Sequence, residues 1–233
     1  MDGKRGGLEF LRNDSLSSTS ARDGMPGRDV TSLLEDHAGR LWVGVDGGLT
    51  VYDHGFFRPI LWPDGGPVGI VVAMTEDTAH DVWAQVEGRH CYLIRIKDLK
   101  VSQEISMPSG HTALALAADP RGGIWLGLVN GDLAHYRDGR FERSSLNQGG
   151  DAGSVLSLVV DADGSVWGAT KQGLFRWKDG KVQTLNSRNA FPCDRTYAVV
   201  RDRRGSIWLS TQCGFVAIPD TEMQDGRNTG HKD

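Results

Sequence analysis

The chain has 233 residues, of which 39% are hydrophobic, and a formal net charge of −4. This composition supplies enough apolar material for one sizeable core. The mild negative charge argues against a general nucleic-acid-binding protein, which needs a basic face. No apolar run approaches the roughly 18 residues of a membrane-spanning helix, so we expect no membrane insertion by this segment.

The N-terminal residues, MDGKRGGLEF, lack the apolar core of a signal peptide. The chain is therefore either cytoplasmic as written or a piece of a longer secreted protein. Residues 6–28 are predicted to form a partial repeat unit, because Gly6–Leu11 resembles a third strand without the two strands that should precede it.

Tryptophan then recurs with a near-constant spacing of 41 or 42 residues. The periodic residues are Trp42, Trp83, Trp125, Trp167 and Trp208. An aspartate lies six residues before each of them, and a glycine lies three residues before each except Trp83, where His80 takes that place. A period of about 40 to 45 residues is typical of one four-stranded blade of a β-propeller.

Each repeat is predicted to contain the same four strands. An apolar strand enters, an Asp-x-x-Gly turn follows, and the second strand carries the tryptophan. A Gly-apolar pair then begins a third strand, and an Asp-Gly or similar turn leads into a fourth. The fold class is therefore all-β, a β-propeller of four-stranded antiparallel blades with about five blades of 41–42 residues. The repeat cores are expected near Val30–Ile60, Ile70–Ile105, Thr112–Arg143, Val155–Leu185 and Thr196–Ile218.

The repeats are not equally regular. In the second, His80 must either bear a conformational cost or use a different turn, and the third strand is expected over Tyr92–Ile96. The fifth lacks a fourth strand before the polar and flexible tail predicted for residues 219–233. The simplest arrangement is a single propeller over residues 1–218, in which an N-terminal strand completes the last blade. An open arc is the alternative, and it would have to hide its strand edges, for example by dimerising.

The tryptophans are best explained by packing. A large ring in the second strand of a blade buries its surface against the next blade. Trp177, which lies outside the periodic set, replaces a tyrosine of the neighbouring repeats and is also assigned to the core.

The sequence contains three cysteines without the CxxC spacing of a zinc or redox motif. Cys91, Cys193 and Cys213 are expected to be ordinary half-buried thiols, with a Cys193–Cys213 bridge as the less favoured alternative in an oxidising compartment.

The chain resembles a known family from about Gly6 to Ile218, most closely in the first repeat. Gly24-Met25-Pro26, the run from Val30 through Glu35-Asp36 and Gly39-Arg40-Leu41-Trp42 to Gly44, and Gly47-Gly48-Leu49 are similar to the two-component regulator propeller repeat. The resemblance implies a periplasmic or extracellular sensor of carbohydrates or other ligands, with further sensor and kinase domains as its partners. Its motif residues are structural, so it assigns no catalytic residue.

Ligands of propellers usually bind at the loops of one face, and the loops are where these repeats differ from one another. Trp62 could stack on a sugar ring or simply cap a blade edge. The side chains of Arg89, Lys171 and Arg195 could form a basic mouth, meaning a positively charged opening that binds an anionic ligand, or they could remain solvated surface cations. The candidate ligand-binding residues are Trp62, Arg89, His90, His111, Lys171, Asp194 and Arg195.

The sequence gives no grounds for a cofactor, a metal site or a catalytic residue. Asp161-Ala-Asp163-Gly164 resembles the start of a calcium loop, but the closing glutamate is missing. The predicted function is a non-catalytic ligand-sensing propeller. The alternatives are a protein–protein interaction scaffold and, less favoured, a streptogramin-lyase-like enzyme that would use His111, His90 and Glu87.

Overall fold

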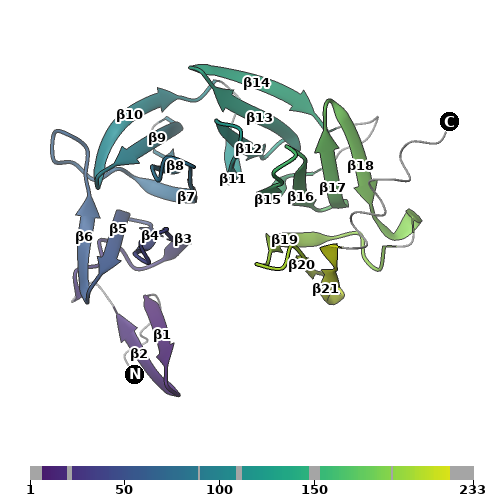
Figure 1. Cartoon of the computed structure of the whole chain (residues 1–233). Coiled ribbons are helices and arrows are strands. Elements are labelled where there is room, and N and C mark those ends of the chain that lie inside the picture. The colour runs from purple at the N-terminus through teal and green to yellow at the C-terminus, as the bar shows by residue number, and fades with distance from the viewer. Residues whose placement is uncertain are drawn as a thin grey trace. The chain divides into compact units, whose positions relative to one another are not determined.

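Antiparallel β-strands make up almost all of the regular structure in the computed structural model, which describes residues 7–19, 23–88, 90–108, 112–146, 153–189 and 191–220 (Figure 1). The chain divides into two compact units, Met1–Ala118 and Asp119–Asp233. None of the helices in the described ranges has the length and apolar character required to cross a bilayer.

The first unit begins with a hairpin and continues with two complete blades, in which each strand pairs with its neighbours in the sequence. The hairpin strands are β1 (Leu8–Arg12) and β2 (Ser15–Thr19). The first blade contains β3 (Val30–Glu35), β4 (Leu41–Val45), β5 (Gly48–Asp53) and β6 (Phe56–Ile60). The second contains β7 (Ile70–Glu76), β8 (Val82–Glu87), β9 (Tyr92–Lys97) and β10 (Lys100–Ser106).

The third blade has the strand order β11-β12-β13-β14, and the boundary between the units falls after β11. Its strands are β11 (Ala113–Ala118), β12 (Ile124–Leu128), β13 (Asp132–Arg137) and β14 (Arg140–Ser145). The fourth blade contains β15 (Val155–Val160), β16 (Val166–Thr170), β17 (Gly173–Lys178) and β18 (Lys181–Leu185), followed by the 3-10 helix η2 (Ser187–Asn189).

The fifth blade has three strands within the described residues: β19 (Thr196–Arg201), β20 (Ile207–Thr211) and β21 (Gly214–Ile218). The all-β, five-bladed propeller fold predicted from the sequence is thereby confirmed. Completion of the fifth blade by an N-terminal strand remains a prediction, as does the flexibility of residues 219–233, of which 221–233 lie outside the described ranges.

The turn that joins the first two strands is the same in all five repeats. In the first repeat, the Asp36 backbone N–H donates to the carbonyl of Arg40 (3.0 Å), and the Gly39 N–H donates back to the Asp36 carbonyl (2.9 Å). Gly39 has a φ of 76°, and the equivalent glycines of the third, fourth and fifth repeats also have positive φ. His80 keeps the same turn with a φ of 65°, so it bears the conformational cost rather than changing the turn.

The periodic tryptophans form the core between blades. Trp42 packs with Val71 and Ala84 of the second blade, and Trp167 packs with Val199 and Leu209 of the fifth. Trp42, Trp83, Trp125 and Trp167 are only 2–7% exposed, whereas Trp208 is 45% exposed.

Trp177 also lies in the core, as predicted. Its ring contacts the Trp125 ring, with the two ring centroids 4.7 Å apart. The fourth blade therefore contributes an aromatic ring to the packing around the tryptophan of the third.

Hydroxyl groups link the innermost strands of successive blades. A β-bulge near the start of β3 places Thr31 and Ser32 side by side, and both hydroxyls donate to the Val71 carbonyl of β7 (2.7 and 2.8 Å). The equivalent bulge in β15 lets Ser157 bond both the carbonyl and the N–H of Val199 in β19 (3.1 Å each).

Candidate functional site

The sequence-predicted ligand residues are divided between the two units. Trp62 and His90 belong to the first unit, and Lys171, Asp194 and Arg195 belong to the second. Arg89 and His111 lie outside the described residues. The predicted basic mouth of Arg89, Lys171 and Arg195 therefore remains a prediction.

In the first unit, the rings of Trp62 and His90 both contact the ring of Tyr92. The Trp62 ring packs edge-on against Tyr92, with centroids 6.2 Å apart, and the His90 ring does the same at 6.3 Å. Trp62 lies in the loop after β6, and Tyr92 begins β9, so this aromatic cluster connects the first two blades. Trp62 is half-buried and packs against the core between these blades, which supports a blade-capping role and leaves part of the ring accessible.

The loop around Trp62 is held by its own backbone. The Trp62 N–H donates to the carbonyl of Gly66 (2.8 Å), and the Gly65 N–H donates to the carbonyl of Trp62 (2.9 Å). A β-bridge between Leu61 and Pro67 closes the loop. The backbone that carries the indole is therefore held by local structure.

In the second unit, the three predicted residues are exposed and serve separate local roles. Lys171 lies in the turn between β16 and β17. The Asp194 carboxylate accepts the Ser187 backbone N–H (2.8 Å), and the hydrogen bonds from Ser187 lower the pKa of Asp194 below its usual value. The Arg195 carbonyl accepts the Gln212 N–H (3.0 Å).

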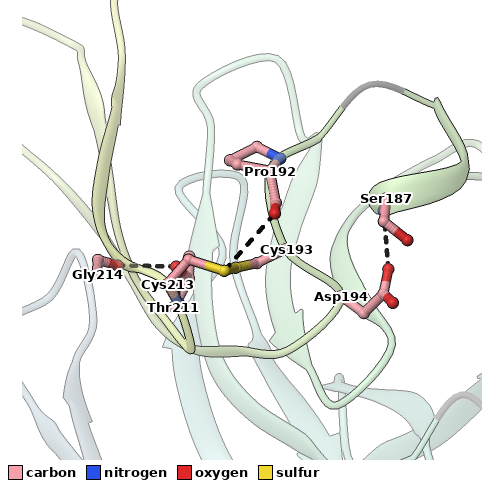
Figure 2. Close-up of a disulfide and its surroundings, with 7 residues drawn as sticks. All are labelled: Ser187, Pro192, Cys193, Asp194, Thr211, Cys213 and Gly214. Carbon is pink, nitrogen blue, oxygen red and sulfur yellow. Dashed lines mark hydrogen bonds between the residues drawn. A yellow bond between two sulfur atoms is a disulfide. The ribbon is translucent and has the colours of Figure 1, made fainter.

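A disulfide joins Cys193 and Cys213, so the expectation of three free thiols is wrong (Figure 2). Thr196 of β19 pairs with Thr211 of β20, and this antiparallel register places the residues just outside the two strands side by side. Their Cα atoms are 6.2 Å apart, within the range for a disulfide. The Cys213 sulfur also lies 3.6 Å from the Pro192 carbonyl, while Cys91 is a free cysteine.

The segment Asp161–Gly164, which resembles the start of a calcium loop, forms the turn of the fourth repeat. Asp161 accepts the Trp167 indole N–H (3.0 Å) and pairs with Arg201 (2.5 Å). Asp163 pairs with Lys178 (2.7 Å). Burial would raise the pKa of Asp163, but the hydrogen bonds from Lys178 and Ser165 lower it well below its usual range. Both carboxylates are thus neutralised by side chains of the protein.

One group of potential metal ligands was missed by sequence reasoning. His37, Glu76 and His80 each offer a ligand atom, and these atoms lie within 4.8 Å of one another. Glu76 and His80 are four residues apart, but His37 lies 39 residues before Glu76, so the three do not form a short ligand motif. The signal that could have found them is the one irregularity in the turn pattern, His80 in the place of glycine.

Comparison with known proteins supports the repeat assignment. Residues 24–47 match the family model described as "Two component regulator propeller", which agrees with the resemblance noted in the sequence. No curated protein matches the chain.

Solved structures with the same fold include the extracellular domain of a two component system and several enzymes. The extracellular domain of the putative hybrid two component system BT3049 from B. thetaiotaomicron is 19% identical, with a TM-score of 0.71 over 94% of this chain and 32% of that one. Virginiamycin B lyase from Staphylococcus aureus is 14% identical, with a TM-score of 0.72 over 92% of this chain and 78% of that one. XC5397 from Xanthomonas campestris, a gluconolactonase, is 14% identical, with a TM-score of 0.63 over 94% and 80% of the two chains.

These identities establish a shared fold and nothing more specific. The chain spans about a third of the length of the BT3049 extracellular domain.

Proposed function

We propose that this chain is a non-catalytic ligand-sensing propeller from the input region of a bacterial two-component regulator. The observation that carries the proposal is the match of residues 24–47 to the two-component regulator propeller model. The fold shared with the extracellular domain of the BT3049 system supports the same role. Further sensor and kinase domains are its expected partners.

The proposed location is the periplasm or the cell exterior. The Cys193–Cys213 disulfide supports it, because disulfides persist in oxidising compartments and are rare in the cytosol. The extracellular location of the BT3049 domain is consistent with it.

The proposed ligand is an oligosaccharide bound at the aromatic cluster of Trp62, Tyr92 and His90. The accessible part of the Trp62 ring offers an apolar surface on which a sugar ring can stack. The His90 imidazole, which contacts the same tyrosine, supplies a hydrogen-bonding group in the cluster.

A thermal-shift screen against a panel of oligosaccharides tests this proposal. A ligand that binds only the folded state stabilises it by RT ln(1 + [L]/Kd), so a true ligand raises the melting temperature, and the shift grows with the logarithm of its concentration. We expect Trp62→Ala to abolish the shift. Phe56→Ala is the matched control, because Phe56 is an aromatic residue of the same blade that is 71% exposed and lies outside the cluster.

A shift that survives Trp62→Ala would place the ligand elsewhere. The absence of any shift across the panel, together with capture of a protein partner by the chain, would favour the scaffold alternative. Circular dichroism of Trp62→Ala confirms that the variant retains its fold.

An enzymatic function is the second candidate, and the fold shared with virginiamycin B lyase and a gluconolactonase favours it. We expect no turnover of a streptogramin or of gluconolactone by the purified chain. Turnover that is lost in His90→Ala would overturn the non-catalytic proposal.

A further inference from the structure

Two histidines and one glutamate come together where the first two blades meet. His37 lies in the β3–β4 turn of the first blade, Glu76 is the last residue of β7, and His80 lies in the β7–β8 turn of the second blade. The His37 Nδ1 atom is 2.5 Å from Glu76 Oε1, and the His80 Nδ1 atom is 3.6 Å from the same oxygen. The two imidazole rings stack with their centroids 3.7 Å apart.

The backbone at His80 shows that this arrangement carries a conformational cost. The other four repeats have glycine at this position, with φ between 76° and 99°. His80 adopts the same left-handed conformation at 65°, which a residue with a Cβ enters at a cost that glycine avoids. The turn itself does not need the imidazole, because the glycine repeats make the same turn without it. Strain of this kind is commonly kept at functional sites.

The three residues occur together only at this junction. At the positions of His37 and Glu76, the third repeat has Pro120 and Ala118, and the fourth has Ala162 and Val160. The group is therefore not a by-product of the repeat.

The Glu76 carboxylate is already oriented for a ligand role. Its second oxygen, Oε2, accepts the backbone N–H of His37 (2.8 Å), which fixes the carboxylate and directs Oε1 toward the two imidazoles. Hydrogen bonds of this kind orient the ligands of protein metal sites.

The donor set defines the class of ion. Two imidazole nitrogens and one carboxylate oxygen suit Zn²⁺ and similar transition metals, whereas Mg²⁺ and Ca²⁺ prefer oxygen ligands alone. In a tetrahedral zinc site, neighbouring ligand atoms are about 3.3 Å apart. The two separations from Glu76 Oε1, 2.5 and 3.6 Å, lie on either side of that spacing, and all three ligand atoms lie within 4.8 Å of one another, so side-chain rotations would bring them into the range of a shared ion.

We infer that His37 Nδ1, Glu76 Oε1 and His80 Nδ1 form a Zn²⁺ site that joins the first two blades. The Glu76 side chain is only 14% exposed, whereas His37 and His80 are 44% and 57% exposed. The ion thus faces solvent on one side, and its fourth coordination position is open to water or to an external ligand, as in zinc sites with three protein ligands.

Calorimetric titration of the chelator-treated, untagged chain with ZnCl2 tests the inference. We expect one zinc ion bound per chain at this site, and a melting temperature raised by Zn²⁺ but not by equimolar Mg²⁺. His80→Gly removes one ligand and restores the residue found in the other four repeats, so this variant should fold normally. We expect it to bind Zn²⁺ at least tenfold more weakly, and Glu76→Gln to do the same.

His54→Ala is the matched control. His54 also places its Nδ1 atom 2.5 Å from a carboxylate oxygen, that of Asp53, in an exposed turn of the first blade. We expect this variant to bind Zn²⁺ like the unmodified chain. Zinc binding that is unchanged in His80→Gly, or equally weakened in His54→Ala, would overturn the inference, as would the absence of binding to the unmodified chain.

Discussion

At the scale of single residues, the recurring aspartate and tryptophan act as one unit. In the first repeat, Asp36 Oδ1 accepts the N–H groups of Ala38 and Arg40 (3.0 Å each), which closes the turn. Asp36 Oδ2 accepts the indole N–H of Trp42 (2.8 Å), which satisfies the polar atom of a buried ring. The hydrogen bond from the tryptophan indole N–H to the aspartate carboxylate recurs in every repeat at 2.8–3.1 Å. The fixed spacing of six residues thus has a direct physical cause.

The contribution of the periodic tryptophans is tested by Trp125→Ala. Trp125 is 3% exposed, and its ring contacts both His135 and Trp177, so truncation leaves a large cavity and removes the indole hydrogen bond to Asp119. We expect a loss of about 3–5 kcal/mol in the free energy of unfolding. Trp208→Ala is the matched control, because Trp208 makes the same aspartate bond while 45% exposed. Urea denaturation should show that Trp208→Ala loses at most about 2 kcal/mol in the free energy of unfolding. Equal losses in the two variants would refute the packing argument.

The turn aspartates also predict the response to acid. Burial would raise the pKa of Asp36 and Asp119, but hydrogen bonds from the tryptophan and the neighbouring arginine lower both below 3.8. A carboxyl group with a lowered folded-state pKa stabilises the fold above its unfolded pKa, and this contribution is lost as the pH falls through the folded value.

We therefore expect the contribution of these two carboxylates to be lost below about pH 4, as a fall in the urea midpoint. Asp119→Asn should be less stable at pH 7 and should show a smaller further loss on acidification. A variant that loses as much stability between pH 6 and pH 3 as the unmodified chain would show that Asp119 makes no such contribution.

At the scale of secondary-structure elements, the strands could be predicted well because their signals are local. The turn residues mark each boundary, and the third strand of the irregular second repeat, expected over Tyr92–Ile96, is β9 (Tyr92–Lys97). The sequence does not favour the disulfide, because an odd cysteine count excludes a fully paired set within one chain. Its signal lies in the register of β19 and β20, which brings residues outside the two strands together.

The disulfide ties the loop before β19 to the β20–β21 turn. It joins cysteines separated by 20 residues, and constraining a loop of that length in the unfolded chain stabilises the folded state by about 2–4 kcal/mol. We expect Cys193→Ser to lose that much stability under non-reducing conditions. Cys91→Ser, which removes the unpaired cysteine, should leave the urea midpoint nearly unchanged.

Reduction provides the complementary measurement. Dithiothreitol should lower the urea midpoint of the unmodified chain and of Cys91→Ser, but should not affect Cys193→Ser. If the reductant also destabilised Cys193→Ser, the disulfide would not be the source of the effect.

At the scale of the whole molecule, the repeat determines the fold but not the function. The same residues that identify the propeller recur in every blade, so they cannot distinguish a sensor from a lyase or a lactonase of the same fold. The departures from the repeat are more informative. Trp62, predicted as a loop residue, meets His90 on Tyr92, a contact between two blades that no sequence spacing reveals. The group of His37, Glu76 and His80 likewise needs two turns to lie side by side.

The oxidation state of the three cysteines in the cell indicates the compartment in which the protein is located. If the protein is periplasmic or extracellular, Cys193 and Cys213 are paired in the cell and Cys91 is the remaining thiol. We expect protein isolated from its native cells under alkylating conditions, then denatured, to carry one modified cysteine by mass spectrometry. A reducing cytosol would instead leave all three cysteines open to alkylation. Cys91 serves as the internal control, since it should be modified in either case, so three modified cysteines would contradict the proposed location.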